Sequence, residues 1–184
     1  MSATAALIAS TLNAGTPLLL AGIGILIHER SGVLNLGIEG IMLMGAVAGF
    51  GTCYLTGSFF LGFAAAALVG MVLSALFGFL TLGLYANQNA AGLAMAIFGA
   101  GLAAFIGQPL QGVSLAARAC EGIPFLRDIP FVGDAFFSSH VLVYVALFMA
   151  GAAACFLYKS RWGLILRAAG ESPKSAYALG YPVR

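Results

Sequence analysis

Long apolar stretches separated by short polar inserts dominate the sequence. The apolar stretches cover about 5–27, 41–55, 60–85, 90–106 and 141–158. Within them hydrophobic residues run continuously instead of alternating, which is typical of membrane-spanning helices and not of a transmembrane β-barrel. Only helices and closed barrels satisfy their backbone hydrogen bonds inside a bilayer. The pattern therefore predicts an all-α fold, a polytopic transmembrane helical bundle with about five spans in a single domain.

The composition excludes a soluble globular domain. Hydrophobic residues make up 61% of the 184 residues and charged residues 8%, against about 25% charged residues in soluble domains. The cysteines, Cys53, Cys120 and Cys155, are scattered, and two of them lie in apolar spans. We therefore expect no disulfide framework, no metal site and no cofactor.

Charged residues fall into three clusters that predict the orientation in the membrane. None occurs between residues 40 and 117. The last cluster, 159–184, holds five basic residues and one acidic residue, a net charge of +4, whereas each of the other two has a net charge of −1. The positive-inside rule places the last cluster in the cytosol. Counting spans back from it places the loop 107–140 outside, the insert 28–40 inside and the N-terminus outside.

Two spans carry features that favour contact with protein over contact with lipid alone. Asn13, Thr16 and Pro17 make the first half of the first span polar and prone to a kink, which fits a helix facing protein or a pathway. Gly45 and Gly49 in the second span form a GxxxG pattern, which predicts close packing against a neighbouring helix.

The insert 28–40, H-E-R-S-G-V-L-N-L-G-I-E-G, is the first polar interruption. Broken helices of this kind line substrate sites in transporters, where irregular backbone is tolerated beside a cavity. For Glu29 and Arg30 a solvated cytosolic turn is the favoured interpretation. Asn35 and Glu39 each stand within an apolar stretch, which favours a place in a substrate pathway.

A run of three amides, Asn87, Gln88 and Asn89, forms the second polar interruption. Amide side chains offer hydrogen-bond donors and acceptors without charge, and they bind sugars, bases or backbone equally well. Two interpretations are therefore open. The amides line a pathway for a neutral solute, or they cap the adjoining helices at the membrane surface.

The cationic segment 159–184 contains a short predicted helix at 173–179. Ser172 is a good N-cap, and Pro173 suits the first helical position, where no backbone N–H is needed. Gly180 can adopt the left-handed conformation that ends a helix. A helix of about two turns is marginal alone in water. The interpretation is either a helix that docks on a soluble partner or a capped loop helix without a partner.

Four motifs together resemble one transporter family. They are E-R-S-G-V-L-N-L-G-I-E-G-I-M-L-M-G-A at 29–46, A-N-Q at 86–88, G-L-A at 92–94, and R-W-G-L-I-L-R-A-A-G-E-S-P-K-S-A-Y-A-L-G at 161–180. The chain resembles the inner-membrane permeases of ABC transporters for branched-chain amino acids, simple sugars and nucleosides, and most of all the nucleoside and simple-sugar branch. Family members continue with several more spans, so the chain corresponds to about the N-terminal three-fifths of such a permease.

The resemblance implies a multi-pass subunit of the bacterial inner membrane that forms the path of a small polar solute by alternating access. Its implied partners are an ABC ATPase subunit, a second permease subunit and an extracytoplasmic solute-binding protein, in a lipid bilayer and without nucleic acid. The cytoplasmic segment would couple to the ATPase. The coupling residues are then Gly170, Glu171, Ser172, Pro173, Lys174, Ala176, Ala178 and Leu179.

Two other function classes find less support. The chain has no G-x-x-x-x-G-K-[ST] motif, so the family's ATP hydrolysis belongs to a partner and this chain is not an enzyme. An ion-coupled secondary transporter, the alternative, needs an ionisable group within a span. The predicted spans contain none, and Glu39 at a span boundary is the nearest candidate. An intramembrane enzyme would rest on Glu39 and two isolated histidines, His28 and His140.

Overall fold

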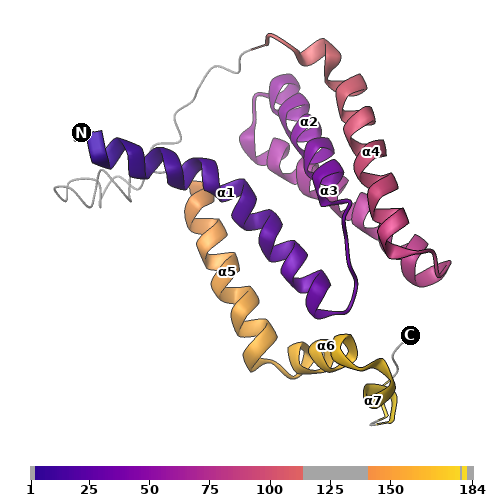
Figure 1. The fold of residues 1–184 in the computed structure, drawn as a ribbon. Helices are drawn as coiled ribbons and strands as arrows, with labels where there is room; N and C mark the ends of the chain where they lie inside the picture. Colours follow the sequence, from indigo (N-terminus) through magenta and orange to yellow (C-terminus); the bar gives the residue numbers. More distant parts are fainter. Residues whose placement is uncertain (1–2, 114–140, 179, 182–184) are drawn as a thin grey trace. The chain divides into compact units, whose positions relative to one another are not determined.

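The described part of the chain is helical. The computed structural model describes residues 3–113, 141–178 and 180–181, and within them it contains no strand (Figure 1). The α-helices are α1 (Ala3–Arg30), α2 (Ile38–Thr56), α3 (Phe59–Gly78), α4 (Gln88–Gly107), α5 (Val141–Lys159), α6 (Arg161–Glu171) and α7 (Pro173–Ala178). A π-helical turn, Phe79–Gly83, extends α3, and a 3₁₀ turn, Gln108–Leu110, follows α4.

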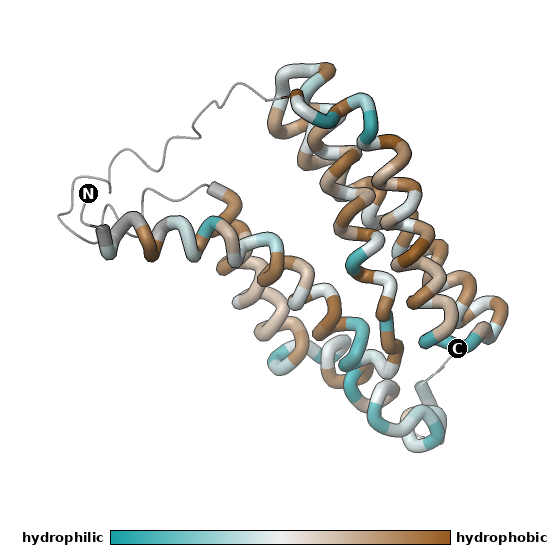
Figure 2. Tube along the Cα trace, turned by 45° about the horizontal axis from the view of Figure 1, so that its top comes forward, coloured by the Kyte–Doolittle hydropathy of each residue, from teal (hydrophilic) through white to brown (hydrophobic). Residues whose placement is uncertain are grey.

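Five of these helices, α1 to α5, are long and apolar enough to cross a membrane. Figure 2 shows brown, hydrophobic residues along much of their length. The predicted all-α polytopic bundle with five spans is confirmed. The predicted outer loop falls almost wholly on residues 114–140, which lie outside the described part, so its side of the membrane stays a prediction.

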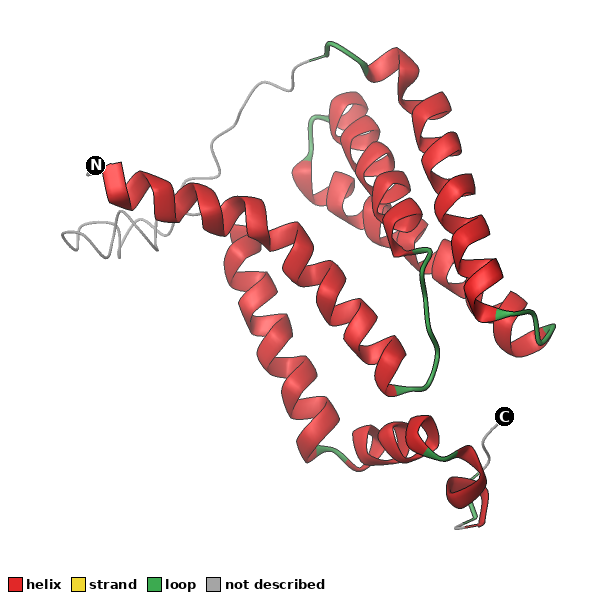
Figure 3. Cartoon of the chain, in the orientation of Figure 1, coloured by secondary structure: helices red, strands yellow, loops and turns green. Residues whose placement is uncertain are grey.

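The insert 28–40 contains a loop and no re-entrant half-helix. α1 continues to Arg30, and α2 begins at Ile38. Figure 3 shows the connection between them as loop. At the end of α1, the hydroxyl of Ser31 donates a 2.7 Å hydrogen bond to the carbonyl of His28, and its backbone N–H donates to the same carbonyl at 3.0 Å. These bonds satisfy a carbonyl that the end of a helix leaves without an intrahelical partner.

The chain divides into two compact units, which we describe separately. One contains α2, α3 and α4, and the other contains α1, α5, α6 and α7. The organisation as a single transmembrane domain stays a prediction.

In the first unit α2 packs on both α3 and α4. The α2–α3 contact uses the GxxxG pattern, since a Cβ added to Gly49 would lie 3.2 Å from the Ala66 Cβ and 3.2 Å from the Gly62 carbonyl oxygen. The packing predicted from Gly45 and Gly49 is therefore present, and Gly62 of α3 completes it. The buried core of this unit consists of Ile41, Met44, Leu73, Phe77, Met95 and Ala103.

The α2–α4 contact is even closer. A Cβ added to Gly99 would lie 2.6 Å from the Cα of Gly40, and one added to Gly92 would lie 2.8 Å from the backbone nitrogen of Leu36. Such distances leave no room for a side chain, so the two helices meet backbone to backbone. The paired residues increase together along both helices, so α2 and α4 run in the same direction.

In the second unit α5 packs along α1, and α6 contacts both. Val143 and Ala146 of α5 are buried, as is Thr16 of α1. Thr16 avoids an unsatisfied hydroxyl because its Oγ1 donates a 2.7 Å hydrogen bond to the carbonyl of Leu12. Figure 1 shows α1 and α5 running in the same direction, and α6, which follows α5, also contacts α1. Consequently Arg30 and Lys159, at the ends of these helices, lie on the same side.

Candidate functional site

The amide run forms the start of α4. Asn87 is the N-cap, and its side-chain oxygen accepts hydrogen bonds from the backbone N–H groups of Asn89, at 3.0 Å, and Ala90, at 3.3 Å. These are two of the N–H groups that a helix start leaves without intrahelical partners. Of the two interpretations of the amide run, the capping role is therefore present for Asn87.

Gln88 joins the amide run to the first polar insert. Its Oε1 accepts a 2.9 Å hydrogen bond from the backbone N–H of Leu34, across 54 residues of sequence. Asn35, the next residue of the loop, is only 5% exposed, and its Oδ1 accepts a 2.9 Å hydrogen bond from the backbone N–H of Gly37. The structure thus brings the two inserts together at one end of the α2–α4 pair.

Glu39, Asn87 and Asn89 are the exposed members of this group, and Asn87 is the helix N-cap described above. Glu39 lies in the first turn of α2, where the helix dipole favours a carboxylate. The five predicted pathway residues divide by what their side chains contact. Asn35, Asn87 and Gln88 use side-chain oxygens to hold the backbone, whereas Glu39 and Asn89 face outward.

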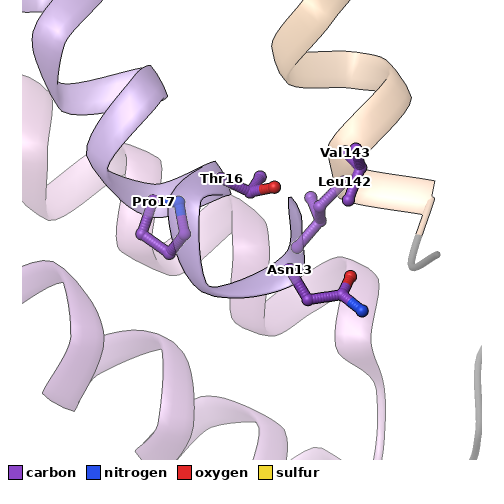
Figure 4. Close-up of a pocket in the computed structure, with 5 residues that line it drawn as sticks. All are labelled: Asn13, Thr16, Pro17, Leu142 and Val143. Atoms are coloured by element: carbon purple, nitrogen blue, oxygen red, sulfur yellow. The ribbon is translucent and has the colours of Figure 1, made fainter. Parts of the chain in front are cut away.

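A second candidate site lies between α1 and α5. A shallow hollow of about 270 Å³ is lined by Asn13, Thr16, Pro17, Leu142 and Val143 (Figure 4). The sequence indicated that the first half of this span is polar but did not assign these residues to a site. The α5 residues that line the hollow, Leu142 and Val143, are apolar and lie near the start of that helix. The hollow therefore could not be predicted from the polar residues of α1.

The short helix predicted at 173–179 is present as α7. At its start the Ser172 Oγ accepts from the backbone N–H of Ser175 at 3.4 Å, and its carbonyl accepts from the N–H of Ala176 at 3.0 Å. The predicted N-cap is confirmed. Leu179 lies outside the described residues.

The predicted glycine end of α7 is confirmed as well. Gly180 has a φ of 85°, and its N–H donates a 3.0 Å hydrogen bond to the carbonyl of Tyr177. The N–H of Tyr181 donates to the carbonyl of Ala176 at 3.2 Å. This pair of bonds around a left-handed glycine is a Schellman motif.

The side chains of α7 differ in exposure. Ala176, one of the predicted coupling residues, is only 2% exposed, and α7 contacts α6. Lys174 and Ala178 are exposed, and so is Tyr177 at 73%. Ala176 therefore holds α7 against the chain, and the outward surface is carried by its neighbours.

The structure also contains a helix that the sequence analysis did not predict. α6 occupies 161–171, so Glu171 is the last residue of one helix as well as the residue before the N-cap of the next. Ser160 is the N-cap of α6, since its Oγ accepts a 2.9 Å hydrogen bond from the N–H of Gly163. The signal was available in this serine and in the apolar residues at helical spacing that follow it.

Arg167 of α6 has an unusual environment. Its guanidinium carbon lies 4.8 Å from the centre of the Tyr158 ring, a cation–π contact with the last turn of α5. Its Nε is buried and has no hydrogen-bond partner within the described part of the chain. Arg167 therefore packs α6 onto α5.

Comparison with known proteins shows the family of this chain. The family described as "Branched-chain amino acid transport system / permease component" matches residues 7–184. The chain belongs to this permease family. A putative glucose ABC transporter permease protein of Haloferax volcanii is 42% identical over 187 residues, covering 100% of this chain and 57% of the relative.

Two further relatives of the permease chain come from bacteria. A nucleoside ABC transporter permease protein of Lactococcus lactis is 33% identical over 188 residues, and a guanosine ABC transporter permease protein of Bacillus subtilis is 33% identical over 193. Each alignment covers 96% of this chain and 59% of the relative. The permease chain thus spans less than two thirds of the length of these curated relatives. No solved structure matches it.

Family membership and five apolar helices together identify the permease chain as a multi-pass protein of the cell membrane. The resemblance expected from the four sequence motifs is confirmed. The membership does not assign roles to individual residues.

Proposed function

We propose that this chain contributes to the membrane-spanning permease subunit of an ABC importer for a small polar solute, with ATP hydrolysed by a separate subunit. The single observation that carries the proposal is the 42% identity to a putative glucose permease along the whole chain. The other two relatives are named for a nucleoside and for guanosine. All three names refer to neutral or weakly ionised polar solutes, so a simple sugar or a nucleoside is the proposed class.

The proposed pathway residues act in two ways. Asn35, Asn87 and Gln88 position the backbone where α2 and α4 begin, because their oxygens accept backbone hydrogen bonds. Glu39 and Asn89 are exposed beside them and offer a carboxylate and an amide to a polar solute. Binding sites for small molecules such as sugars and nucleosides combine a few hydrogen-bonding groups with an otherwise apolar lining.

Coupling to the ATPase is assigned to the segment 170–179. The support is its geometry: a six-residue helix capped at both ends, held by the buried Ala176, with Lys174 and Tyr177 exposed. Helices this short need a supporting surface to persist. Gly170, Glu171, Ser172, Pro173, Ala178 and Leu179 complete the proposed contact segment. A second permease subunit and an extracytoplasmic binding protein complete the proposed importer.

The test is reconstituted transport. The permease would be co-expressed with its candidate ATPase and second permease, placed in proteoliposomes, and supplied with binding protein and radiolabelled glucose, guanosine or leucine. We expect uptake of glucose or guanosine that requires internal ATP and is unaffected by dissipating the proton gradient. Uptake that follows an imposed proton gradient without ATP would overturn the proposal and favour the ion-coupled transporter. Uptake of leucine alone would overturn the proposed solute class.

A further inference from the structure

The position of α6 fixes its depth relative to the membrane. The spanning helix α5 ends at Lys159, and α6 begins at Arg161. Ser160 joins them closely, because its Oγ donates a 2.7 Å hydrogen bond to the carbonyl of Phe156, one turn back in α5. Figure 1 shows α6 running across the end of α5 and not continuing it. A helix placed this way lies at the level where the span leaves the hydrocarbon.

A glycine keeps α6 at that level. A Cβ added to Gly163 would overlap the carbonyl oxygen of Phe156 and lie 2.7 Å from the Cα of Leu157. α6 is therefore pressed against the last turn of α5 by direct backbone contact. The Arg167–Tyr158 contact holds its middle against the same turn.

α6 is amphipathic. Trp162, Ile165, Leu166 and Ala169 follow the spacing i, i+3, i+4 and i+7, which places them on one face of the helix. Arg167 and Glu171 lie on the opposite side. Trp162 is 73% exposed although it is the largest apolar side chain of the segment. The described residues of its own unit therefore do not cover it.

Basic and aromatic residues surround this tryptophan. Lys159 and Arg161 are both exposed, and Tyr158, 60% exposed, precedes them. Tryptophan and tyrosine concentrate at the membrane–water interface, where an apolar ring and a polar edge are both satisfied. Basic residues next to a span on the cytoplasmic side are attracted to anionic lipid headgroups. The basic side chains thus match anionic lipid headgroups, and the aromatic rings match the membrane–water interface.

We propose that α6 is an interfacial anchor, with Trp162 in the headgroup–acyl boundary and Lys159 and Arg161 on the phosphates of anionic phospholipids. The occupant of this face is the bilayer and not a soluble subunit. The inference goes beyond the proposed transport function and does not depend on it. Its consequence is that lipid contact, through α6, sets the height at which α7 is held.

The experiment uses the fact that Trp162 is the single tryptophan of this sequence. The chain is placed in nanodiscs of phosphatidylcholine and phosphatidylglycerol, and its fluorescence is quenched either by brominated acyl chains or by aqueous acrylamide. The matched control is the double variant Trp162→Phe/Tyr177→Trp, which moves the probe from α6 to α7. The two positions are equally exposed in the structure, at 73% each. Only their predicted contact with lipid differs.

We expect brominated lipid to quench Trp162 at least about twofold more than the α7 probe, and acrylamide to show the reverse order. Quenching of Trp162 by acrylamide with no response to brominated lipid would overturn the proposal. It would instead indicate a face that water or a soluble subunit covers.

The charge contribution is tested with Lys159→Gln/Arg161→Gln. When only phosphatidylglycerol is brominated, this variant is expected to need more of it for half-maximal quenching, about fivefold for each charge removed and about 25-fold for the two together. Lys174→Gln, which removes an exposed charge from α7, is the control and is expected to leave the titration unchanged. An unchanged titration in the double variant would refute the headgroup contact, and its folding is checked by the Trp162 response to brominated phosphatidylcholine.

Discussion

The α2–α3–α4 unit and the α5–α6–α7 segment are held together by different combinations of contacts. In the first, glycines remove side chains so that backbones touch, as Gly40 does with Gly99. In the second, Gly163 makes one such backbone contact with α5, and serine side chains cap the short helices, as Ser160 and Ser172 do. Close packing tolerates almost no added volume, whereas a cap loses only one or two hydrogen bonds when it is removed. Mutations in the two regions are therefore expected to differ in size and in consequence.

The largest effect is expected from Gly99→Leu. The new side chain would begin 2.6 Å from the backbone of Gly40, so α2 and α4 must separate, at a cost of about 3 kcal/mol. We expect a lower melting temperature in detergent and a lower yield in the membrane. Gly101→Leu is the matched control, because a Cβ at Gly101 meets nothing within 4 Å. Equal stability of the two variants would contradict backbone contact between α2 and α4.

A smaller and more local effect is expected from Ala176→Arg. Ala176 is 2% exposed, and burying an unpaired charge there would cost more than releasing a six-residue helix. We therefore expect α7 to leave its support, at a cost of about 1–3 kcal/mol. Detachment of α7 is measured as faster cleavage at Lys174 by a lysine-specific protease, with normal membrane levels.

Ala178→Arg provides the comparison for this variant, because Ala178 is exposed on the same short helix. It is expected to leave cleavage at Lys174 unchanged and to weaken ATPase co-purification, since the proposed contact surface includes it. If the two alanine variants are cleaved equally fast, the burial of Ala176 does not hold α7.

The helices and caps could be predicted from sequence because their causes are local. An apolar run is visible along the chain, and Ser172 and Gly180 stand at the ends of one short segment. The contacts that build the candidate site are not local. Gly40 meets Gly99, and Leu34 meets Gln88 54 residues away, so no pattern in either stretch indicates its partner. For the same reason the amide run by itself leaves both interpretations open, since nothing in it indicates the loop that Gln88 binds.

The helix α6 was not predicted from the sequence for a different reason. Its charges and its position within a basic cluster indicated a cytosolic segment. Within that segment only the capped helix after it was predicted. The same local patterns that predicted α7 were present in α6, with Ser160 as N-cap and a stripe beginning at Trp162. The burial of Ala176 could not be predicted without α6, which contacts α7.

An intermediate effect is expected from removing the cap of α4. Asn87→Ala loses the acceptor of two backbone N–H groups, which is expected to lower the free energy of unfolding by about 1 kcal/mol. Asn87→Asp keeps a capping oxygen and is expected to restore stability. If Asn87 instead contacts solute directly, uptake would stay impaired in Asn87→Asp while the melting temperature recovers. Thermal unfolding and uptake measured on both variants separate the two roles.

The smallest effect, and the one whose sign is most informative, is expected from Glu171→Lys. If only the helix after Ser172 existed, this carboxylate would sit beside its positive N-terminal end, and the substitution would weaken it. In the structure Glu171 is also the last residue of the eleven-residue α6, where the helix dipole favours a positive charge. Because Glu171 lies within α6 but outside the six-residue α7, the α6 end is expected to dominate. We therefore expect a slight stabilisation, within about 0.5 kcal/mol, that shrinks at high salt because exposed charges are screened. Thermal unfolding at low and high ionic strength measures it, with Glu171→Gln expected to give a smaller change of the same sign. A destabilisation that salt removes would mean that the start of α7 governs this residue, and that α6 ends before it.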